Sequence, residues 1–388
     1  MLLLACVGLA VWLHLVALHG GFWRLTERER DLAPKGAPAP SGLRVTAIVP
    51  ARDEAEAIGT SLETLLSQRF SGAFDVVLVD DQSRDGTADL ARACAARLGA
   101  SERLSVLETQ GPASGWTGKL GAMQQGFAQV TARAAPPDFV LFCDADIGFE
   151  ADVLERLVAG ALRRGAVLTS LMARLRCEST AERWFVPAFV FFFQMLYPFA
   201  FVNDSSRKTA AAAGGVMLIR PAALIAAGGL EAIRGALIDD CALGALMKTQ
   251  GPIWLGLAEG AHSLRPYPKY ADIEAMVTRS AYAELRYSPL RLIGAILGMA
   301  LVYLAPPLLA LFGEGFARGA GLAAYALMTL AYSPSVRFYG LSMGYAFALP
   351  LIAACYTWFT LESALRHWRG QGGAWKGRYQ APAARRDI

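Results

Sequence analysis

Three clusters of acidic side chains in this sequence could bind a metal ion together with a phosphorylated substrate. Each cluster follows a short apolar run: Asp53 and Glu54 come after residues 45–50, Asp80 and Asp81 after 76–79, and Asp144 and Asp146 after 139–143. Neighbouring carboxylates repel each other unless a positive charge lies between them. Mg²⁺ or Mn²⁺, bound by one or two carboxylates and by phosphate oxygens, supplies that charge. Because alternate residues at a strand end point the same way, we expect Asp144 and Asp146 to share the metal.

A glycine-rich segment with one lysine lies between the second and third clusters. Residues 115–122 read GWTGKLGA, and Leu120 follows Lys119 where a nucleotide-binding P-loop has Ser or Thr. A P-loop enzyme is therefore disfavoured. The glycines still allow the backbone to approach an anion, with Lys119 as a point charge. The alternative is an ordinary glycine loop with a solvated lysine.

A further acidic pair, Asp239 and Asp240, opens a predicted helix downstream of the turn Gly214-Gly215. Acids at a helix N-terminus are favoured by the helix dipole, which is sufficient to explain them. The functional alternative is a general base. Asp85 is a comparable case, since a lone acid in a turn is usually a capping residue.

Alternating strands and helices are needed to position these groups. The runs 45–50, 76–79 and 139–143 are rich in branched side chains, as is typical of buried parallel strands, and helical patterns separate them. This pattern predicts an α/β fold with a mostly parallel sheet and helices on both faces. Ligands of such sheets bind beyond the carboxyl ends of the strands, where the acidic clusters lie.

The composition restricts the class of protein. Of the 388 residues, 54% are hydrophobic and 18% are charged, and the net charge is +4. These values exclude a disordered chain and make a purely soluble one improbable, and the chain has no aromatic-studded basic stripe for nucleic acid. The six cysteines form no C-x-x-C pair, so we expect reduced thiols rather than disulfides or a zinc site.

Apolar segments at both ends predict a membrane protein. We expect a transmembrane anchor at 1–23, a linker at 24–42, a catalytic domain at 43–290, a transmembrane region at 291–365 and a basic tail at 366–388. By the positive-inside rule, the domain lies in the cytoplasm, because the basic residues Arg24, Arg28, Arg30 and Lys35 follow the anchor. With apolar segments at both ends, we expect a multi-pass protein of the inner membrane.

The C-terminal topology stays open at this level. The apolar stretches are 292–312, 319–332 and 341–361, and the second is short for a span. Three spans would put the tail outside, whereas its basic residues favour the cytoplasm. Either one stretch is re-entrant or the charge rule fails here.

Residues 184–202 form an uncharged stretch rich in aromatic side chains. A transmembrane position would separate Asp144 and Asp146 from Asp239 and Asp240. We therefore expect an interfacial segment at the membrane surface. The alternative is a buried core helix.

The order of six motifs resembles that of family 2 glycosyltransferases with a GT-A fold. The motifs are VPARDE (49–54), VLVDDQSRDGT (77–87), GWTGKLGAMQQG (115–126), CDADI (143–147), AGGVMLIRP (213–221) and IDDCALGALMK (238–248). More narrowly, the chain resembles hopanoid-biosynthesis-associated membrane glycosyltransferases, which are similar to ceramide glucosyltransferases.

The resemblance implies a role for each motif. The implied donor-site residues are Asp53 and Glu54 near the nucleotide, Asp81 at the base, Lys119 at the diphosphate, and Asp144 and Asp146 at the nucleotide sugar and its Mg²⁺ or Mn²⁺. The implied acceptor-side residues are Gly214, Gly215 and Arg286. Asp240 is implied as the general base, with Asp239 where the family more often has Glu. Tyr287 follows Arg286 where related enzymes have Trp, so the role of Arg286 rests on a partial match.

These expectations amount to an inverting glycosyltransferase that uses a nucleotide-sugar donor of the UDP class. The expected acceptor is a lipid, a hopanoid or a related molecule. The alternatives are transfer to polyprenyl phosphate or to a ceramide- or diacylglycerol-type lipid, and a non-catalytic membrane scaffold. A processive polysaccharide synthase and a transporter fit less well, because the terminal apolar segments are few and nearly free of acids.

Overall fold

The computed structural model describes residues 1–34 and 38–380, and the chain divides into two units. The sheet unit comprises Glu27–Arg176 and Phe201–Pro266. The helical unit comprises Met1–Thr26, Cys177–Ala200 and Tyr267–Ile388. The predicted domain 43–290 thus differs from the observed sheet unit, because 177–200 and 267–290 belong to the helical unit.

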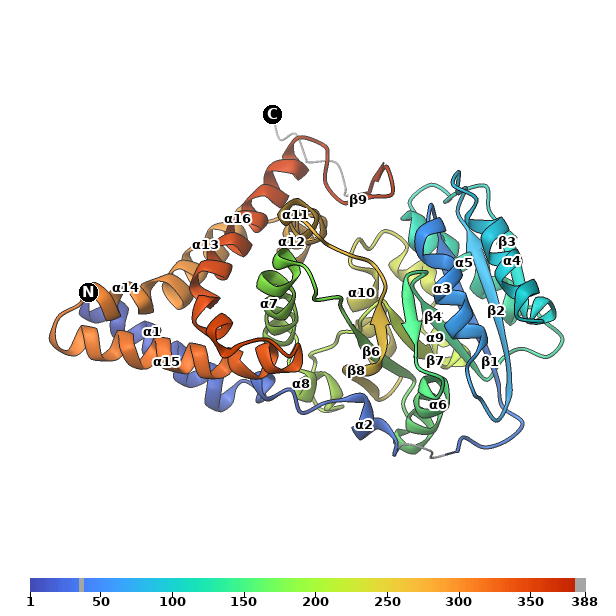
Figure 1. Ribbon diagram of the computed structural model, residues 1–388, viewed down its shortest axis with the longest axis horizontal. Coiled ribbons are helices and arrows are strands. Elements are labelled where there is room, and N and C mark those ends of the chain that lie inside the picture. The colour runs from blue at the N-terminus through green and yellow to red at the C-terminus, as the bar shows by residue number, and fades with distance from the viewer. Residues whose placement is uncertain (35–37, 381–388) are drawn as a thin grey trace. The chain divides into compact units, whose positions relative to one another are not determined.

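The sheet unit contains a sheet of eight strands in the order β3-β2-β1-β4-β7-β6-β8-β5 (Figure 1). The strands are β1 (Arg44–Ala51), β2 (Ala73–Asp80), β3 (Leu104–Glu108), β4 (Phe139–Cys143), β5 (Ile147–Phe149), β6 (Leu168–Arg174), β7 (Val216–Ile219) and β8 (Ile253–Ser263). β3, β2, β1 and β4 run parallel to one another, as do β6 and β8. β7 is antiparallel to both β4 and β6, and β5 is antiparallel to β8. The expected mostly parallel sheet is therefore present in a mixed form.

Helices cover both faces of this sheet. The helices of the unit are α2 (Glu29–Leu32), α3 (Ala55–Leu66), α4 (Thr87–Arg97), α5 (Gly118–Thr131), α6 (Val153–Arg164), α9 (Pro221–Ala226) and α10 (Asp239–Lys248). Val45, Ala47 and Val49 share a buried cluster with residues of α3, α4 and α6. Ile48 points to the other face, where a Cβ on Gly126 of α5 would lie only 2.7 Å from its Cγ2 atom. Alternation along β1 thus produces two apolar faces, each of which needs a helix.

The parallel register brings the predicted acidic clusters to one edge. β1 and β2 pair from Arg44↔Ala73 to Ala51↔Asp80, and β1 also pairs with β4. The chain therefore leaves β1, β2 and β4 at the same edge of the sheet, as expected for parallel neighbours. The segments after these strands carry Asp53, Asp81 and Asp144.

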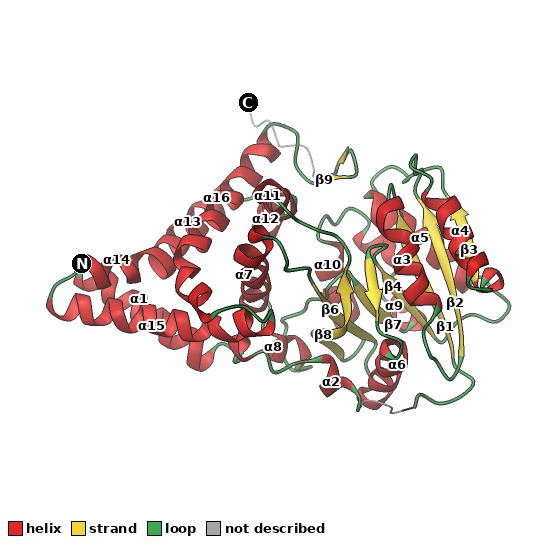
Figure 2. Ribbon diagram, viewed as in Figure 1, coloured by secondary structure: helices red, strands yellow, loops and turns green. Residues whose placement is uncertain are grey.

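Within its described residues, the helical unit consists of helices, their connecting loops and a short hairpin (Figure 2). Its elements are α1 (Leu2–Leu18), α7 (Thr180–Leu196), α11 (Tyr270–Thr278), α12 (Ala281–Glu284), α13 (Pro289–Met299), α14 (Ala305–Phe312), α15 (Gly315–Phe338), α16 (Leu349–Trp368) and strands β9 (Ala374–Trp375) and β10 (Arg378–Tyr379). α8 (Phe199–Asn203) falls on the boundary between the units. A π-helical turn, Ala300–Leu304, joins α13 to α14 just before Pro306 and Pro307. Prolines lack the N–H for regular helical bonding, so a wider turn at this point keeps the two helices continuous.

Two helical stretches in the described residues are long and apolar enough to cross a membrane, Pro289–Phe312 and Met343–Trp368. The first contains the predicted stretch 292–312, and the second contains the predicted stretch 341–361 except for its first two residues. The predicted stretch 319–332 lies within α15, which does not meet that criterion, and α1 is a shorter apolar helix. The number of spans and the side of the C-terminus remain predictions.

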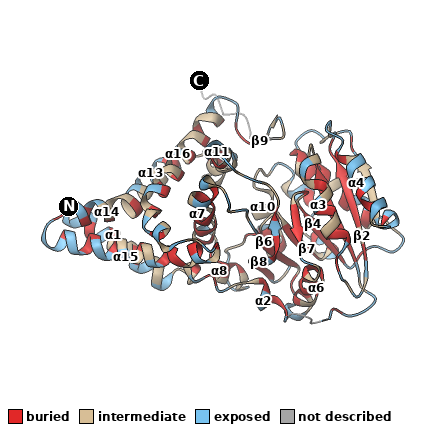
Figure 3. Ribbon diagram, in the orientation of Figure 1, coloured by how far each residue is buried: buried red, intermediate tan, exposed pale blue. Residues whose placement is uncertain are grey.

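The aromatic stretch 184–202 begins in α7, which packs on α11, α15 and α16 within the helical unit. Phe185 and Phe191 are buried, and the Tyr356 hydroxyl donates to the Phe185 carbonyl oxygen at 2.9 Å. Figure 3 shows the buried residues of α7 in red. Much of this stretch thus forms the core of the helical unit, and its position at a membrane surface remains a prediction.

Parts of the predicted linker and tail, residues 35–37 and 381–388, lie outside the described residues. The described part of the linker includes α2, where the buried Glu29 carboxylate is 2.9 Å from the Arg156 guanidinium and accepts the N–H groups of Glu259 and Gly260. This segment is therefore folded onto the sheet unit rather than extended.

All six cysteines are free, as expected.

Candidate active site

Lys119 connects two of the predicted acidic pairs. Its ammonium Nζ lies 2.8 Å from Asp144 Oδ1 and 3.2 Å from Asp239 Oδ2. Lys119 is in the first turn of α5, where the helix dipole disfavours a cation, so neighbouring acids must compensate. Burial by itself lowers the pKa of Lys119, but the carboxylates of Asp144, Asp239 and Asp240 outweigh this and raise it. The lysine is therefore firmly protonated.

Asp240 is held by two backbone N–H groups at the start of α10. Its Oδ2 accepts from Gly214 at 3.0 Å and its Oδ1 accepts from Cys241 at 2.8 Å. Burial and the charge of Asp239 raise the pKa of Asp240 to about 6, against the opposing effect of Lys119. A carboxyl group with this pKa is ionised at neutral pH and is basic enough to accept a proton.

The Gly214-Gly215 turn allows these groups to approach closely. A Cβ on Gly214 would lie 3.1 Å from Lys119 Nζ and 3.4 Å from Asp240 Oδ2. The Gly215 carbonyl accepts the Asp144 N–H at 3.3 Å. The turn thus lines the same centre as Lys119, Asp144 and Asp240, and a side chain at 214 would displace it.

Asp144 and Asp146 are held by different cations. β4 ends at Cys143 and β5 begins at Ile147, so the pair lies in a connecting turn rather than on a strand. Asp144 contacts Lys119, whereas Asp146 Oδ2 accepts from Arg265 Nε at 2.6 Å. Burial and the charge of Asp146 raise the pKa of Asp144, although Lys119 opposes this. The pair therefore does not alternate along a strand as expected, and the sharing of one metal by the two residues remains a prediction.

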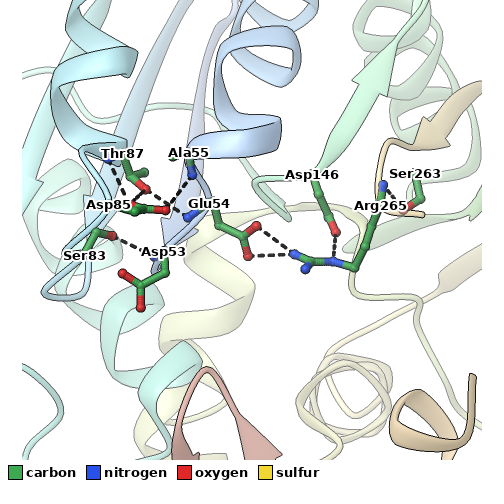
Figure 4. Close-up of polar contacts among 9 residues, drawn as sticks. All are labelled: Asp53, Glu54, Ala55, Ser83, Asp85, Thr87, Asp146, Ser263 and Arg265. Atoms are coloured by element: carbon green, nitrogen blue, oxygen red, sulfur yellow. Dashed lines mark hydrogen bonds and ion pairs between the residues drawn. The ribbon is translucent and has the colours of Figure 1, made fainter. Parts of the chain in front are cut away.

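Arg265, which follows β8, was not among the residues predicted from the sequence. Its Nη2 donates to both Glu54 oxygens, at 2.8 and 2.7 Å, so that one guanidinium joins Glu54 to Asp146 (Figure 4). The apolar run before it, residues 253–258, is the signal that could have located this strand end. Without β8, nothing in the sequence connects Arg265 to acids more than a hundred residues away.

The backbone around Asp53 is ordered by short polar contacts (Figure 4). Asp53 has a left-handed φ of 50°, its N–H donates to Ser83 Oγ, and its Oδ1 accepts the Arg84 N–H at 2.8 Å. Asp85 accepts from the Ala55 N–H and the Thr87 hydroxyl, which is the capping role expected for a lone acid. This segment therefore fixes the loops after β1 and β2.

Asp81 is buried beside this segment, and its carbonyl accepts from Arg52 Nη1 at 2.6 Å. Its predicted contact with a nucleotide base remains a prediction, as do the donor roles of Asp53 and Glu54. Arg286 belongs to the helical unit, where it follows α12 with a left-handed φ of 52°. Its predicted acceptor-side role likewise remains a prediction.

The carboxylates of Asp144 and Asp146 suit Mg²⁺ or Mn²⁺ only if a bound substrate supplies further ligands to the metal. Within residues 1–34 and 38–380, no group of three or more His, Cys, Asp or Glu side chains is arranged to hold a metal ion. Asp144 and Asp146 offer carboxylate oxygens, which Mg²⁺ and Mn²⁺ prefer, and these ions often take the rest of their ligands from substrate phosphates and water. The two residues therefore fit a metal that binds together with a diphosphate.

Comparison with known proteins indicates that the chain is a glycosyltransferase. Residues 46–226 match the family model of glycosyl transferase family 2. No curated protein matches this chain significantly. This family match includes the segments that carry Asp53, Asp81, Lys119, Asp144 and Gly214, but not Asp240 or Arg265.

Of three solved structures that match this chain, the first reaches a TM-score of 0.50 and the other two score lower. The mannosyltransferase PcManGT from Pyrobaculum calidifontis, in complex with GDP-Man and Mn²⁺, is 20% identical with a TM-score of 0.50, covering 92% of this chain and 98% of its own. The mannosyl-3-phosphoglycerate synthase of Rubrobacter xylanophilus is 19% identical (TM-score 0.39; 70% and 77% covered). S. aureus TarS 1-349 in complex with UDP is 16% identical (TM-score 0.40; 85% and 92% covered). The likeness to PcManGT concerns the fold alone, and the mixed, mostly parallel sheet of this chain fits the GT-A type.

Proposed function

We propose that this chain, a glycosyltransferase by its family 2 match over residues 46–226, transfers a sugar from a nucleotide-sugar donor to a lipid with inversion. The proposed donor is of the UDP class, and the proposed acceptor is a hopanoid or a related lipid. The observation that carries the proposal is the lysine held between Asp144 and Asp239, with the basic carboxylate of Asp240 beside it.

Lys119 would stabilise the leaving group. Breaking the bond between the sugar and the diphosphate places negative charge on the diphosphate oxygens. A fixed, protonated amine near those oxygens stabilises that charge without reorganising during the reaction. Asp144 and Asp146 would hold a divalent metal, which when bound adds positive charge beside the same phosphates. In this proposal the donor diphosphate would lie near Lys119.

Asp240 would accept the proton of the acceptor hydroxyl. Each of its oxygens accepts one backbone N–H, and a carboxylate oxygen retains capacity for a further hydrogen bond. The acceptor oxygen forms a bond to the anomeric carbon, its proton goes to Asp240, and the nucleoside diphosphate departs from the opposite side. One displacement of this kind inverts the anomeric configuration.

The helical unit supports a membrane location and hence a lipid acceptor. Large apolar side chains on its helices are exposed, for example Leu290 (79%), Leu311 (69%) and Phe312 (75%). A patch of this kind marks a surface that meets lipid or protein. We propose that α13–α14 and α16 cross the cytoplasmic membrane, that the chain is multi-pass and that the sheet unit faces the cytoplasm. Residues 184–202 would lie near the membrane surface, and Arg286 would serve the acceptor.

Lipid mass spectrometry tests this proposal. The wild-type chain and Asp240→Asn are expressed in a hopanoid-producing host that lacks the gene, and total lipids are compared. A lipid heavier by one sugar with the wild type alone supports transfer and identifies the acceptor, including polyprenyl phosphate, ceramide or diacylglycerol. Identical lipid profiles from the two strains, together with no binding of a nucleotide sugar by the purified chain, would favour the scaffold alternative.

A further inference from the structure

One arginine bridges two carboxylates that come from different strand ends. Arg265 reaches Asp146, after β4, through Nε at 2.6 Å, and Glu54, after β1, through Nη2 at 2.7 and 2.8 Å. Figure 4 shows the guanidinium between the two acids. Both acids are largely buried, with 13% of each side chain exposed, whereas Arg265 is 34% exposed. Arg265 is thus the most exposed of the three residues.

The charges of the cluster explain why the arginine is there. Two carboxylates that share a site repel each other, and one guanidinium between them reduces their net charge from −2 to −1. The guanidinium fork suits this task, because several N–H donors point outward in one plane. Arg265 therefore provides the positive charge that a divalent cation would otherwise provide at Asp146.

We propose that Arg265 is an internal counter-ion that occupies Asp146 before the donor binds and competes with the metal for it. The inference rests on the proposed metal role of Asp146. A guanidinium and a divalent cation on one carboxylate repel each other, so the metal binds Asp146 well only when Arg265 withdraws. Glu54 gives Arg265 a second partner, which keeps the guanidinium in the site after it leaves Asp146.

The competition makes metal binding depend on the nucleotide. A diphosphate brings negative charge that offsets the repulsion between the metal and Arg265, so the metal binds more tightly when the nucleotide is present. This coupling is reciprocal, because any ligand that strengthens metal binding is itself bound more tightly in the presence of the metal. The enzyme would thus load metal and donor together rather than the metal alone.

Binding of Mn²⁺ to the purified full-length chain in detergent tests the proposal. The free Mn²⁺ signal is followed by electron paramagnetic resonance, with and without UDP. Without UDP, Arg265→Gln should bind Mn²⁺ about tenfold more tightly than the wild type, the size expected when one charge is removed a few ångströms from a divalent ion in a solvated site. UDP should then strengthen Mn²⁺ binding less in this variant than in the wild type.

Two variants control for charge and for shape. Arg133→Gln removes an arginine of similar exposure, 32%, that pairs with Asp75 elsewhere in the sheet unit, and it should bind Mn²⁺ like the wild type. Arg265→Lys keeps the positive charge without the fork, and its affinity should stay within about threefold of the wild type because the charge dominates. If Arg265 instead positioned Asp146 for the metal, both Arg265 variants would bind Mn²⁺ more weakly, and that result would overturn the proposal.

Thermal unfolding provides a readout that does not depend on activity. Without metal, Arg265→Gln leaves Glu54 and Asp146 without their shared cation, so its melting temperature should fall below that of the wild type. Added Mn²⁺ should raise the melting temperature more in this variant than in the wild type. An equal rise in both would contradict competition.

The metal role of Asp146 and the competition by Arg265 can be tested separately. If Mn²⁺ with UDP binds the wild type and Asp146→Asn equally, Asp146 is not a metal ligand, and both the metal role and the competition are wrong. If binding requires Asp146 but Arg265→Gln has the wild-type affinity, only the competition is wrong, and the proposed transfer at Lys119 and Asp240 stands.

Discussion

The carboxylates of Asp144 and Asp146 differ in the cation that holds each of them. Asp144 contacts Lys119, a largely buried lysine that also contacts Asp239. Asp146 contacts Arg265, which is more exposed and shared with Glu54. Lys119 is thus held between two acids with 21% of its side chain exposed, whereas Arg265 is 34% exposed and pairs with two acids at once.

This difference separates a permanent charge from an exchangeable one. A buried lysine held by several carboxylates costs a great deal to deprotonate or move, which suits a group that must be in place when the leaving group departs. A partly exposed arginine with a second partner can change its contacts at a smaller cost. Loss of the Lys119 charge should therefore slow transfer strongly, whereas changes at Arg265 should act mainly on metal binding.

The largest effect is expected at Asp240. Asp240→Asn preserves the shape but removes the base, so the rate of transfer should fall by about 10²-fold or more. The rate is measured with saturating donor and lipid acceptor, and donor binding is measured in parallel. Near-normal transfer by this variant would rule out Asp240 as the base.

Lys119→Met should have the next largest effect. The variant keeps much of the side-chain length but loses the charge, and removal of one such stabilising group costs about 10²-fold in the rate of the chemical step. The loss should appear in kcat more than in KM for the donor, because the charge matters most as the leaving group develops. A change confined to KM would instead assign Lys119 to donor binding alone.

The pH dependence of transfer reports on Asp240. Its pKa is raised to about 6 by burial and by Asp239, and lowered in turn by Lys119. Only the ionised form accepts a proton, so the rate should fall about tenfold per pH unit below about 6 and be level above it. In Lys119→Met the residual activity should begin to fall at a higher pH, because the neighbouring positive charge is gone. If the rate of the wild type instead began to fall only near pH 4, this account would be contradicted.

The smallest effect is expected at Gly214. A Cβ here would lie 3.1 Å from Lys119 Nζ, so Gly214→Ala should displace the amine by a few tenths of an ångström and slow transfer by about fivefold to tenfold. Gly59→Ala is the matched control, because a Cβ on this α3 residue meets nothing within 4 Å. Equal rates in the two variants would show that Lys119 tolerates movement.

The predicted strand ends were the most reliable part of the sequence analysis. Short branched runs at 45–50, 76–79 and 139–143 became β1, β2 and β4, and their parallel register brought the acids after them to one edge. This followed from local pattern and from a general rule of parallel sheets. The pairing of Lys119 with Asp144 and Asp239 was not predictable, because it depends on how α5 and α10 pack.

Long-range pairing also explains what the sequence did not reveal. Arg265 meets Glu54 across 211 positions of the chain and Asp146 across 119. Its location depends on β8 pairing with β6 and β5, which no local pattern encodes. Segments 177–200 and 267–290 belong to the helical unit, and this too was not predictable, because apolar residues by themselves do not indicate which unit they pack in.

The stereochemistry of the product tests most directly whether Asp240 and Lys119 perform a single displacement. The glycolipid formed by the wild-type chain is isolated, and the anomeric configuration of the new linkage is determined by proton NMR and compared with that of the donor. We predict the opposite configuration, because the acceptor oxygen attacks from the side opposite the leaving diphosphate. Retention of the donor configuration would contradict the account, since it requires a second displacement or attack from the leaving-group side.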